Sequence, residues 1–174
     1  MYFWLRLWKI KKQTQLEKKK WRDFISFFKN ENNQKVFGFI FILFSFYFFI
    51  SFFSFFFTYI EDQSEVDKIN SWISFLTNSD IQIENSLGKF GALFSFLFVY
   101  NGFGIASFLI PGFLLFCGLQ LLGYKLISLK KYTTESIWGL IWTPIFIYYF
   151  FESEILSGKI GLSSTEFLID IIGS

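Results

Sequence analysis

The sequence is poor in the residues that most often carry chemistry. It contains no histidine, one cysteine and two prolines among 174 residues. Without histidine, the usual proton-transfer group at neutral pH and the commonest metal ligand are both missing. The lone Cys117 lies inside an apolar run and has no partner for an internal disulfide. These absences argue against a metal centre and against a membrane enzyme with a histidine-based site.

Charged residues are also scarce. They make up 17% of the chain, against about a quarter in soluble domains. Apolar residues reach 53%, and 29 residues are phenylalanine. Phe, Ile, Lys and Asn are abundant together, which fits an AT-rich coding sequence better than an aromatic binding motif. The composition is therefore typical of a membrane protein.

The first long apolar segment covers residues 36–60, twenty-five positions without a charge. As a helix it would reach about 37 Å, more than the roughly 30 Å of a bilayer's hydrocarbon layer. It has no polar face, and 174 residues are too few to bury such a helix on all sides. We therefore predict transmembrane helix 1 at 36–60 and an all-α integral membrane protein.

The second apolar segment, residues 90–124, is uncharged but interrupted by glycines and a proline. One interpretation is a hairpin of two spans that turns at Asn101. The other is an interfacial entry helix at 86–96 followed by one span at 97–123. The first arm of a hairpin would reach only about 22 Å, so its length favours a single span.

Charge also favours the single span. It places Lys125, Lys130 and Lys131 on the same side as the N-terminus, which then holds thirteen of the sixteen basic residues. An excess of Lys and Arg marks the cytoplasmic side of a membrane protein. We expect Pro111 to kink this span and its glycines to allow close helix contacts.

A third, shorter span is predicted at residues 135–151, after a basic cytoplasmic loop at 124–134. Pro144 lies in its middle, and aromatic residues lie near its ends, as in an interfacial belt: Trp138, Trp142, Tyr148 and Tyr149. Residues 152–174 are expected to form an amphipathic tail on the outer side. The predicted architecture thus has three transmembrane helices with short interfacial helices.

Residues 1–35 form a basic segment ahead of the first span. Its most concentrated charges are Lys18, Lys19, Lys20 and Arg22, and Trp21, Phe24, Ile25 and Phe28 follow helical spacing. A basic amphipathic helix next to a span is typical of a segment on an anionic lipid surface. Nothing in it resembles a DNA-recognition helix, so we favour the membrane surface over nucleic acid.

Residues 61–96 are predicted to form an acidic outer loop that contains interfacial helices. Ile69, Trp72, Ile73 and Leu76 follow the spacing of one helix face. This short helix would lie either on the membrane surface or against the protein's own helices.

Motifs for catalysis are missing. The two Gly-Lys pairs, at Gly88 and Gly158, lack the upstream glycine and the following Ser or Thr of a phosphate-binding loop. Apart from Glu135, at the very start of the third, no carboxylate lies inside a predicted span, which argues against a proton relay. A stripe of Ser51, Ser54 and Thr58 on the first span is interpreted as a helix-packing face. We therefore expect no catalytic residue, metal or cofactor site in this chain.

Small residues recur around the second span in a pattern that carries a family resemblance. The segment from Asn85 reads NSLGKFGA, a Gly-Phe-Gly and an Ile-Pro follow it, and GKIG comes later. The residues concerned are Gly88, Gly91, Ala92, Gly102, Gly104, Pro111, Gly158 and Gly161. Their order and spacing resemble the N-terminal four-span membrane domain of FtsK/SpoIIIE DNA translocases over about 36–174.

The resemblance implies an anchor with four spans and both ends in the cytoplasm of a bacterium, at the inner membrane. Such an anchor localises to the division septum, forms homo-oligomers and contacts other division proteins, coupling division to chromosome segregation. ATP, Mg²⁺ and DNA would belong to a motor that is not among these residues. The fourth span is expected beyond Ser174, as in a truncated reading frame or a partial sequence.

An alternative function is a small transport or holin-like protein in which the glycine- and proline-broken span lines a path. Polar residues near mid-membrane would favour it. Only Asn101 and Gln120 come close, and both lie toward the ends of the predicted span.

Overall fold

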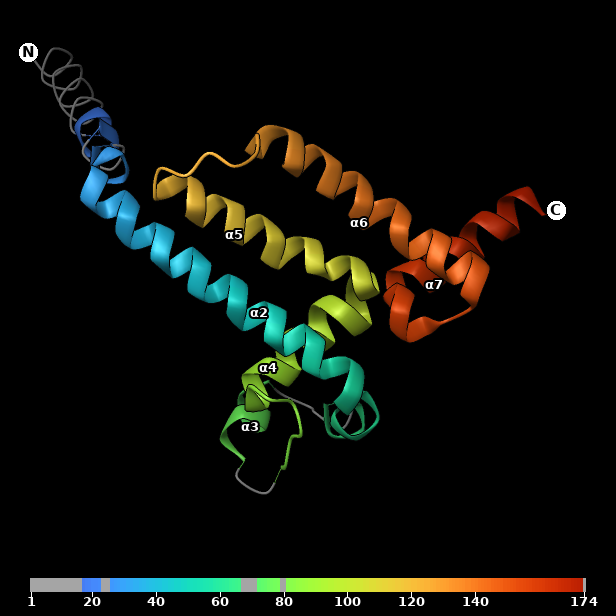
Figure 1. Ribbon diagram of the computed structural model, residues 1–174. Helices are drawn as coiled ribbons and strands as arrows, with labels where there is room; N and C mark the ends of the chain where they lie inside the picture. Colours follow the sequence, from blue (N-terminus) through green and yellow to red (C-terminus); the bar gives the residue numbers. More distant parts are fainter. Residues whose placement is uncertain (1–16, 23–25, 67–71, 79–80, 174) are drawn as a thin grey trace, which may run out of the picture.

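The computed structural model describes residues 17–22, 26–66, 72–78 and 81–173, and every regular element in them is helical (Figure 1). Three helices, α2 (Glu31–Val66), α5 (Leu109–Leu121) and α6 (Leu129–Phe151), run alongside one another, with α5 between the other two. Helix α7 (Glu154–Ile172) packs at one end of this layer, against α6 and the segment that precedes α5. The predicted all-helical class is confirmed.

Helix α2 (Glu31–Val66) is the longest element, at 36 residues. It starts just after Asn30, whose Oδ1 accepts a hydrogen bond from Asn32 N at 3.0 Å, as an N-terminal cap does. It runs past the predicted end at residue 60, because nothing in the charged residues that follow breaks a helix. Many of its apolar side chains face outward, and Phe57 is 72% exposed.

Two helical stretches are long and apolar enough to cross a membrane: Glu31–Ile60 and Gly88–Leu121. They contain the first predicted span and all but the last two residues of the second. Helix α6 (Leu129–Phe151) is not one of them, because its Trp, Tyr and Thr residues dilute its hydropathy. The third span therefore stays a prediction, although α6 begins at Leu129 and is longer than the predicted 135–151.

The second of these stretches consists of four consecutive helical segments. Helix α4 (Gly88–Ser95) continues into a π-helix, η1 (Phe96–Phe103), then a 3₁₀ helix, η2 (Gly104–Phe108), and finally α5 (Leu109–Leu121). The backbone leaves helical geometry at Gly102 (φ −100°, ψ −120°) and Gly104 (φ +58°).

Pro111 is the third residue of α5, which continues directly from the 3₁₀ segment that ends at Phe108. The marked departure from helical geometry lies upstream of it, and the predicted kink at Pro111 itself stays a prediction. The break lies at the glycines, because glycine adopts positive φ without steric cost.

The path of this segment along α2 is re-entrant. Residues 86–94 run from the level of Ser54 to that of Phe48. The chain then turns back until Tyr100 meets Tyr59, with ring centroids 5.6 Å apart. From Gly104 it runs down again as η2 and α5, antiparallel to α2, until Gly118 meets Gly38. The chain therefore runs along the length of α2 once, in a stretch that begins at Gly104, whereas the second span was predicted to begin at residue 97.

The buried core lies between the C-terminal half of α2 and this re-entrant arm. Its fully buried members include Phe52, Phe55, Phe75 and Val99. Phe75 comes from the short helix α3 (Trp72–Thr77), whereas the sequence pattern placed Ile73 on the apolar face. Ile73 is 75% exposed. The fully buried Phe75 shows that α3 packs on the protein's own helices; Ile69 lies outside the described residues.

Replacing Gly118 with isoleucine tests the contact between α2 and α5. A Cβ at Gly118 would lie 2.7 Å from Gly38 O, so we expect the free energy of unfolding to fall by about 1–3 kcal/mol. Denaturant titration in detergent micelles measures the change. Thr134→Ile, at an exposed position of α6, is the matched control, and an equal loss in both variants would refute the close packing.

Candidate functional site

No group of three or more His, Cys, Asp or Glu that could hold a metal ion occurs among the described residues. The candidate site is instead the place where the motif residues meet. Gly102 and Gly104 of the broken segment lie against Gly158 of α7 (Glu154–Ile172). We call these three residues the glycine junction.

The glycine junction is a contact between two backbones. A Cβ on Gly158 would lie 2.6 Å from Gly104 N and 2.7 Å from Val99 O, and one on Gly104 would overlap Leu156 O. Gly158 also interrupts α7, with φ +67° and ψ 170°. Any side chain at Gly104 or Gly158 would force the two segments apart, and both φ values are ones that other residues rarely adopt.

Hydrogen bonds satisfy the broken backbone at this point. Gly104 N donates to Val99 O, and the Ser107 hydroxyl donates to Phe98 O. The Ser157 hydroxyl, fully buried, donates to Ser153 O at 2.8 Å. Irregular backbone at membrane depth is tolerated where protein covers it in this way.

A cation–π contact also holds α7 against the broken segment. Lys159 Nζ lies over the Tyr100 ring, 4.7 Å from its centroid. A cation over an aromatic face contributes about 0.5–2 kcal/mol. Nothing in the sequence pairs Lys159 with Tyr100, so this contact could not be predicted.

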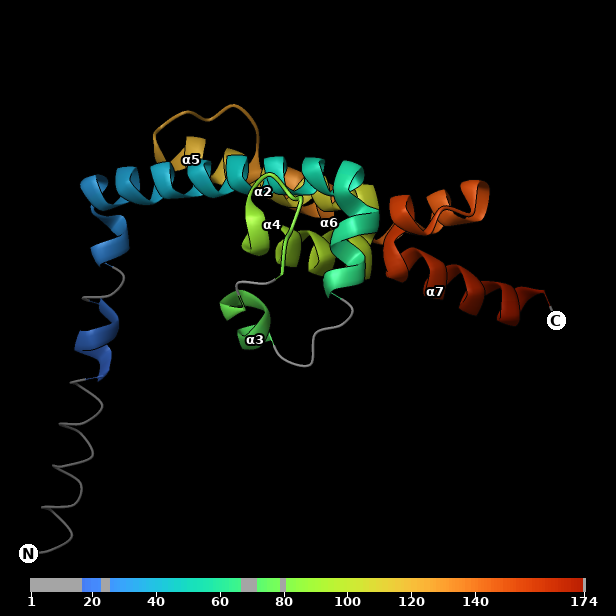
Figure 2. The same ribbon diagram turned by 90° about the horizontal axis from the view of Figure 1, so that it is seen from below.

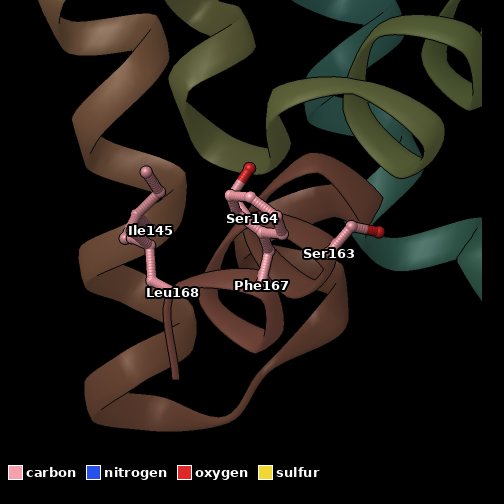
Figure 3. A pocket seen from close by; sticks show the side chains of 5 residues that line it. All are labelled: Ile145, Ser163, Ser164, Phe167 and Leu168. Atoms are coloured by element: carbon pink, nitrogen blue, oxygen red, sulfur yellow. The ribbon is translucent and has the colours of Figure 1, made fainter. Parts of the chain in front are cut away.

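A second close contact joins α7 to α6. A Cβ on Gly161 would lie 2.6 Å from Pro144 O, and the Thr165 hydroxyl donates to Ile145 O at 3.3 Å. Beside it is a shallow hollow of about 340 Å³, shown in Figure 3. Ile145, Ser163, Ser164, Phe167 and Leu168 line it.

The NSLGKFGA segment, residues 85–92, lies apart from the glycine junction, at the start of α4. Asn85, buried, donates from Nδ2 to Ser51 O at 3.1 Å, and its Oδ1 accepts from Leu87 N. Gly91 leaves room for Asn85, because a Cβ there would overlap Asn85 Oδ1. Ala92 is buried, whereas Gly88 has φ +64° with nothing near its missing side chain.

The serine stripe on α2 faces these elements. The Ser51 hydroxyl donates to Gly91 O at 2.7 Å, and the Ser45 hydroxyl donates to Pro111 O at 2.7 Å. Ser54 Oγ accepts from Ser86 N at 2.9 Å. The interpretation of the stripe as a packing face is confirmed for Ser51 and Ser54; Thr58 bonds within its own helix.

One buried carboxylate was not singled out from the sequence. Asp62 is 2% exposed and lies just beyond the apolar stretch that ends at Ile60. It accepts hydrogen bonds from Thr58 Oγ1 at 2.7 Å and from Glu84 N at 2.8 Å. It thereby ties the end of the segment between α3 and α4 to α2. The only signal for this site in the sequence is the i, i+4 spacing of Thr58 and Asp62, which places the two side chains on one face of a helix.

The basic residues singled out in the N-terminal segment lie far from the glycine junction in the chain and in space (Figure 1). Lys18, Lys19, Lys20 and Arg22 are helical and exposed. Residues 1–16, with their further lysines and arginine, lie outside the described residues, as do Phe24 and Ile25.

Comparison with known proteins gives one family. The family model of the 4TM region of DNA translocase FtsK/SpoIIIE matches residues 31–167, well over half of the chain. The match covers every motif glycine as well as α2, α5, α6 and most of α7. No curated protein and no solved structure matches the chain significantly.

The glycine junction is tested by comparing Gly158→Ala with Gly88→Ala. Both positions have positive φ, but only Gly158 meets backbone atoms. We expect Gly88→Ala to cost about 1 kcal/mol for its backbone conformation and Gly158→Ala at least about 3 kcal/mol, because overpacking adds to it. Unfolding in mixed micelles gives both values. Equal costs would mean that α7 does not contact the broken segment.

Proposed function

The chain belongs to the family of the 4TM region of DNA translocase FtsK/SpoIIIE, and on this premise we propose that it anchors a cell-division DNA translocase in the bacterial inner membrane. The match to the membrane region over residues 31–167 carries this proposal. The match is not to a motor, so ATP, Mg²⁺ and DNA would be handled outside these residues. The chain itself would act by insertion, oligomerisation and partner contact rather than by catalysis.

The apolar surface of the helices supports an anchor. Leu43 and Phe46 of α2, and Phe146 and Phe150 of α6, are each about half exposed or more. In water such faces would drive aggregation, whereas lipid or a second protein copy covers them without cost. These outward faces are available for homo-oligomers and for other division proteins.

The distribution of charge supports a cytoplasmic N-terminus. The loop after α5 lies beside the start of α2, because Leu122 approaches Gly38. Lys125, Lys130 and Lys131 therefore share one end of the layer with the basic N-terminal segment (Figure 1). The opposite end holds Asp62, Glu84, Glu152 and Glu154. The positive-inside rule assigns the lysine-rich end to the cytoplasm.

Cysteine labelling in intact cells tests this orientation. In a Cys117→Ser background, Lys130→Cys should react with a membrane-impermeant maleimide only after permeabilisation. Glu152→Cys, at the other end of α6, should react in intact cells. The reverse pattern would overturn the assigned orientation, whatever the location in the cell.

Fluorescence microscopy tests septal localisation. A fluorescent protein fused to the N-terminus of the whole chain should be enriched at the division site. The matched control is the same fusion cut after α2, which retains one span but lacks the glycine junction, and it should spread evenly around the membrane. An even distribution of the whole chain would contradict the proposed function.

The transport alternative gains no support from the described residues. The hydroxyls of Ser45, Ser51 and Ser54 are engaged with neighbouring helices rather than facing a channel. We therefore propose no second function.

A further inference from the structure

The N-terminal basic segment meets α2 at a sharp corner (Figure 2), and the helix is interrupted at Asn30. In that view α2 runs along the layer of helices, whereas residues 17–22 run across its axis. The corner interrupts the helix at one residue, because 26–29 and 31–66 are helical and Asn30 is not. A continuous helix would instead have carried the basic residues straight away from the membrane.

Several contacts fix the corner. Asn30 Oδ1 accepts from Asn32 N at 3.0 Å, and Asn33 Nδ2 donates to Phe27 O at 2.8 Å. The Phe28 ring stacks on Phe37 of α2 at 5.2 Å between centroids. Polar caps and an aromatic contact on either side of the bend therefore hold it in place.

The position of the corner sets the depth of the segment. The apolar part of α2 begins at Val36, about one and a half turns after Asn30. Because α2 crosses the membrane, a segment that runs across its axis at this point lies along the membrane surface. It cannot move more than a few ångströms from the headgroups while the corner persists.

The exposed side chains of this segment are strongly basic. Among the described residues on the two sides of the corner, the exposed bases are Lys18, Lys19, Lys20, Arg22, Lys29 and Lys35, and the exposed acids are Glu17 and Glu31. Apolar rings lie among them: Trp21 is 65% exposed and Phe27 52%. Lysines and arginines beside large aromatic residues are the chemistry that binds an anionic lipid surface.

We propose that residues 17–22 and 26–29 form an in-plane clamp that binds anionic lipid headgroups beside the first span, held there by the Asn30 corner. This goes beyond the anchor function, because it gives the chain a preference for membrane regions rich in anionic lipid. It rests on α2 as a span, and not on septal localisation or on any division protein.

The test places an environment-sensitive dye, nitrobenzoxadiazole, on Glu17→Cys in the whole chain with Cys117→Ser. The protein is reconstituted in vesicles of phosphatidylcholine alone or with phosphatidylglycerol as a minor component. We expect a blue shift and brighter emission in the anionic vesicles only. High salt should reverse the change, because the Debye length falls to about 3 Å at 1 M.

Two variants decide which charges are responsible. Lys18→Gln/Lys19→Gln/Lys20→Gln/Arg22→Gln should abolish the anionic-lipid response, since each basic residue near such a surface contributes about fivefold to binding. Lys125→Gln/Lys130→Gln/Lys131→Gln removes three lysines at the same end and should leave the response intact. Asn30→Ala should weaken it although no charge is lost, because the cap at the corner is removed.

The opposite outcomes overturn the proposal. An equal dye signal in neutral and anionic vesicles, or an intact response in the quadruple variant, would show that these residues do not bind headgroups. A larger change on adding duplex DNA to neutral vesicles at physiological salt would assign the basic segment to nucleic acid. None of these results depends on where the protein lies in a cell, so they leave the test of septal localisation separate.

Discussion

The contact between the two broken backbones at Gly102, Gly104 and Gly158 is the constraint on which the rest of the structure depends. A chain in lipid must satisfy its backbone polar groups within the protein, because no water is available. The second apolar stretch leaves helical geometry at the two glycines, and α7 covers the break. The missing side chains let the two backbones approach that closely. Together with the contact between Gly161 and Pro144 O, the glycine junction fixes the place of α7 against the layer of helices.

Helix α2 provides the reference for every other element. Its serines bind the re-entrant arm and the start of α5, and Gly38 meets Gly118 near its other end. Asp62, near the C-terminal end of α2, binds the segment between α3 and α4, and Asn30 turns the basic segment at the start of α2. One face of α2 thus carries small polar side chains, whereas its other faces are apolar. This division suits a membrane, where small polar groups contribute to helix association and bulky apolar groups face lipid.

The function proposed for the chain needs these features rather than reactive side chains. An anchor must insert in one orientation, keep its helices in register and offer surfaces to partners. The lysine-rich end, the glycine junction and the outward phenylalanines meet these needs in turn. The in-plane basic clamp would add a sensitivity to lipid charge that insertion alone does not give.

The sequence by itself determined the solvent and the class of the protein, because long uncharged runs such as 36–60 can be stable only in lipid. It also pointed to the motif glycines and the family. It could not predict that the break lies at Gly102 and Gly104, since glycine permits a positive φ without requiring it. Nor could it predict that Phe75 is buried, that Asp62 binds Glu84 N, or that Asn30 turns the chain. Those features depend on contacts between residues far apart in the chain or on competing local caps, and only the tertiary structure decides among them.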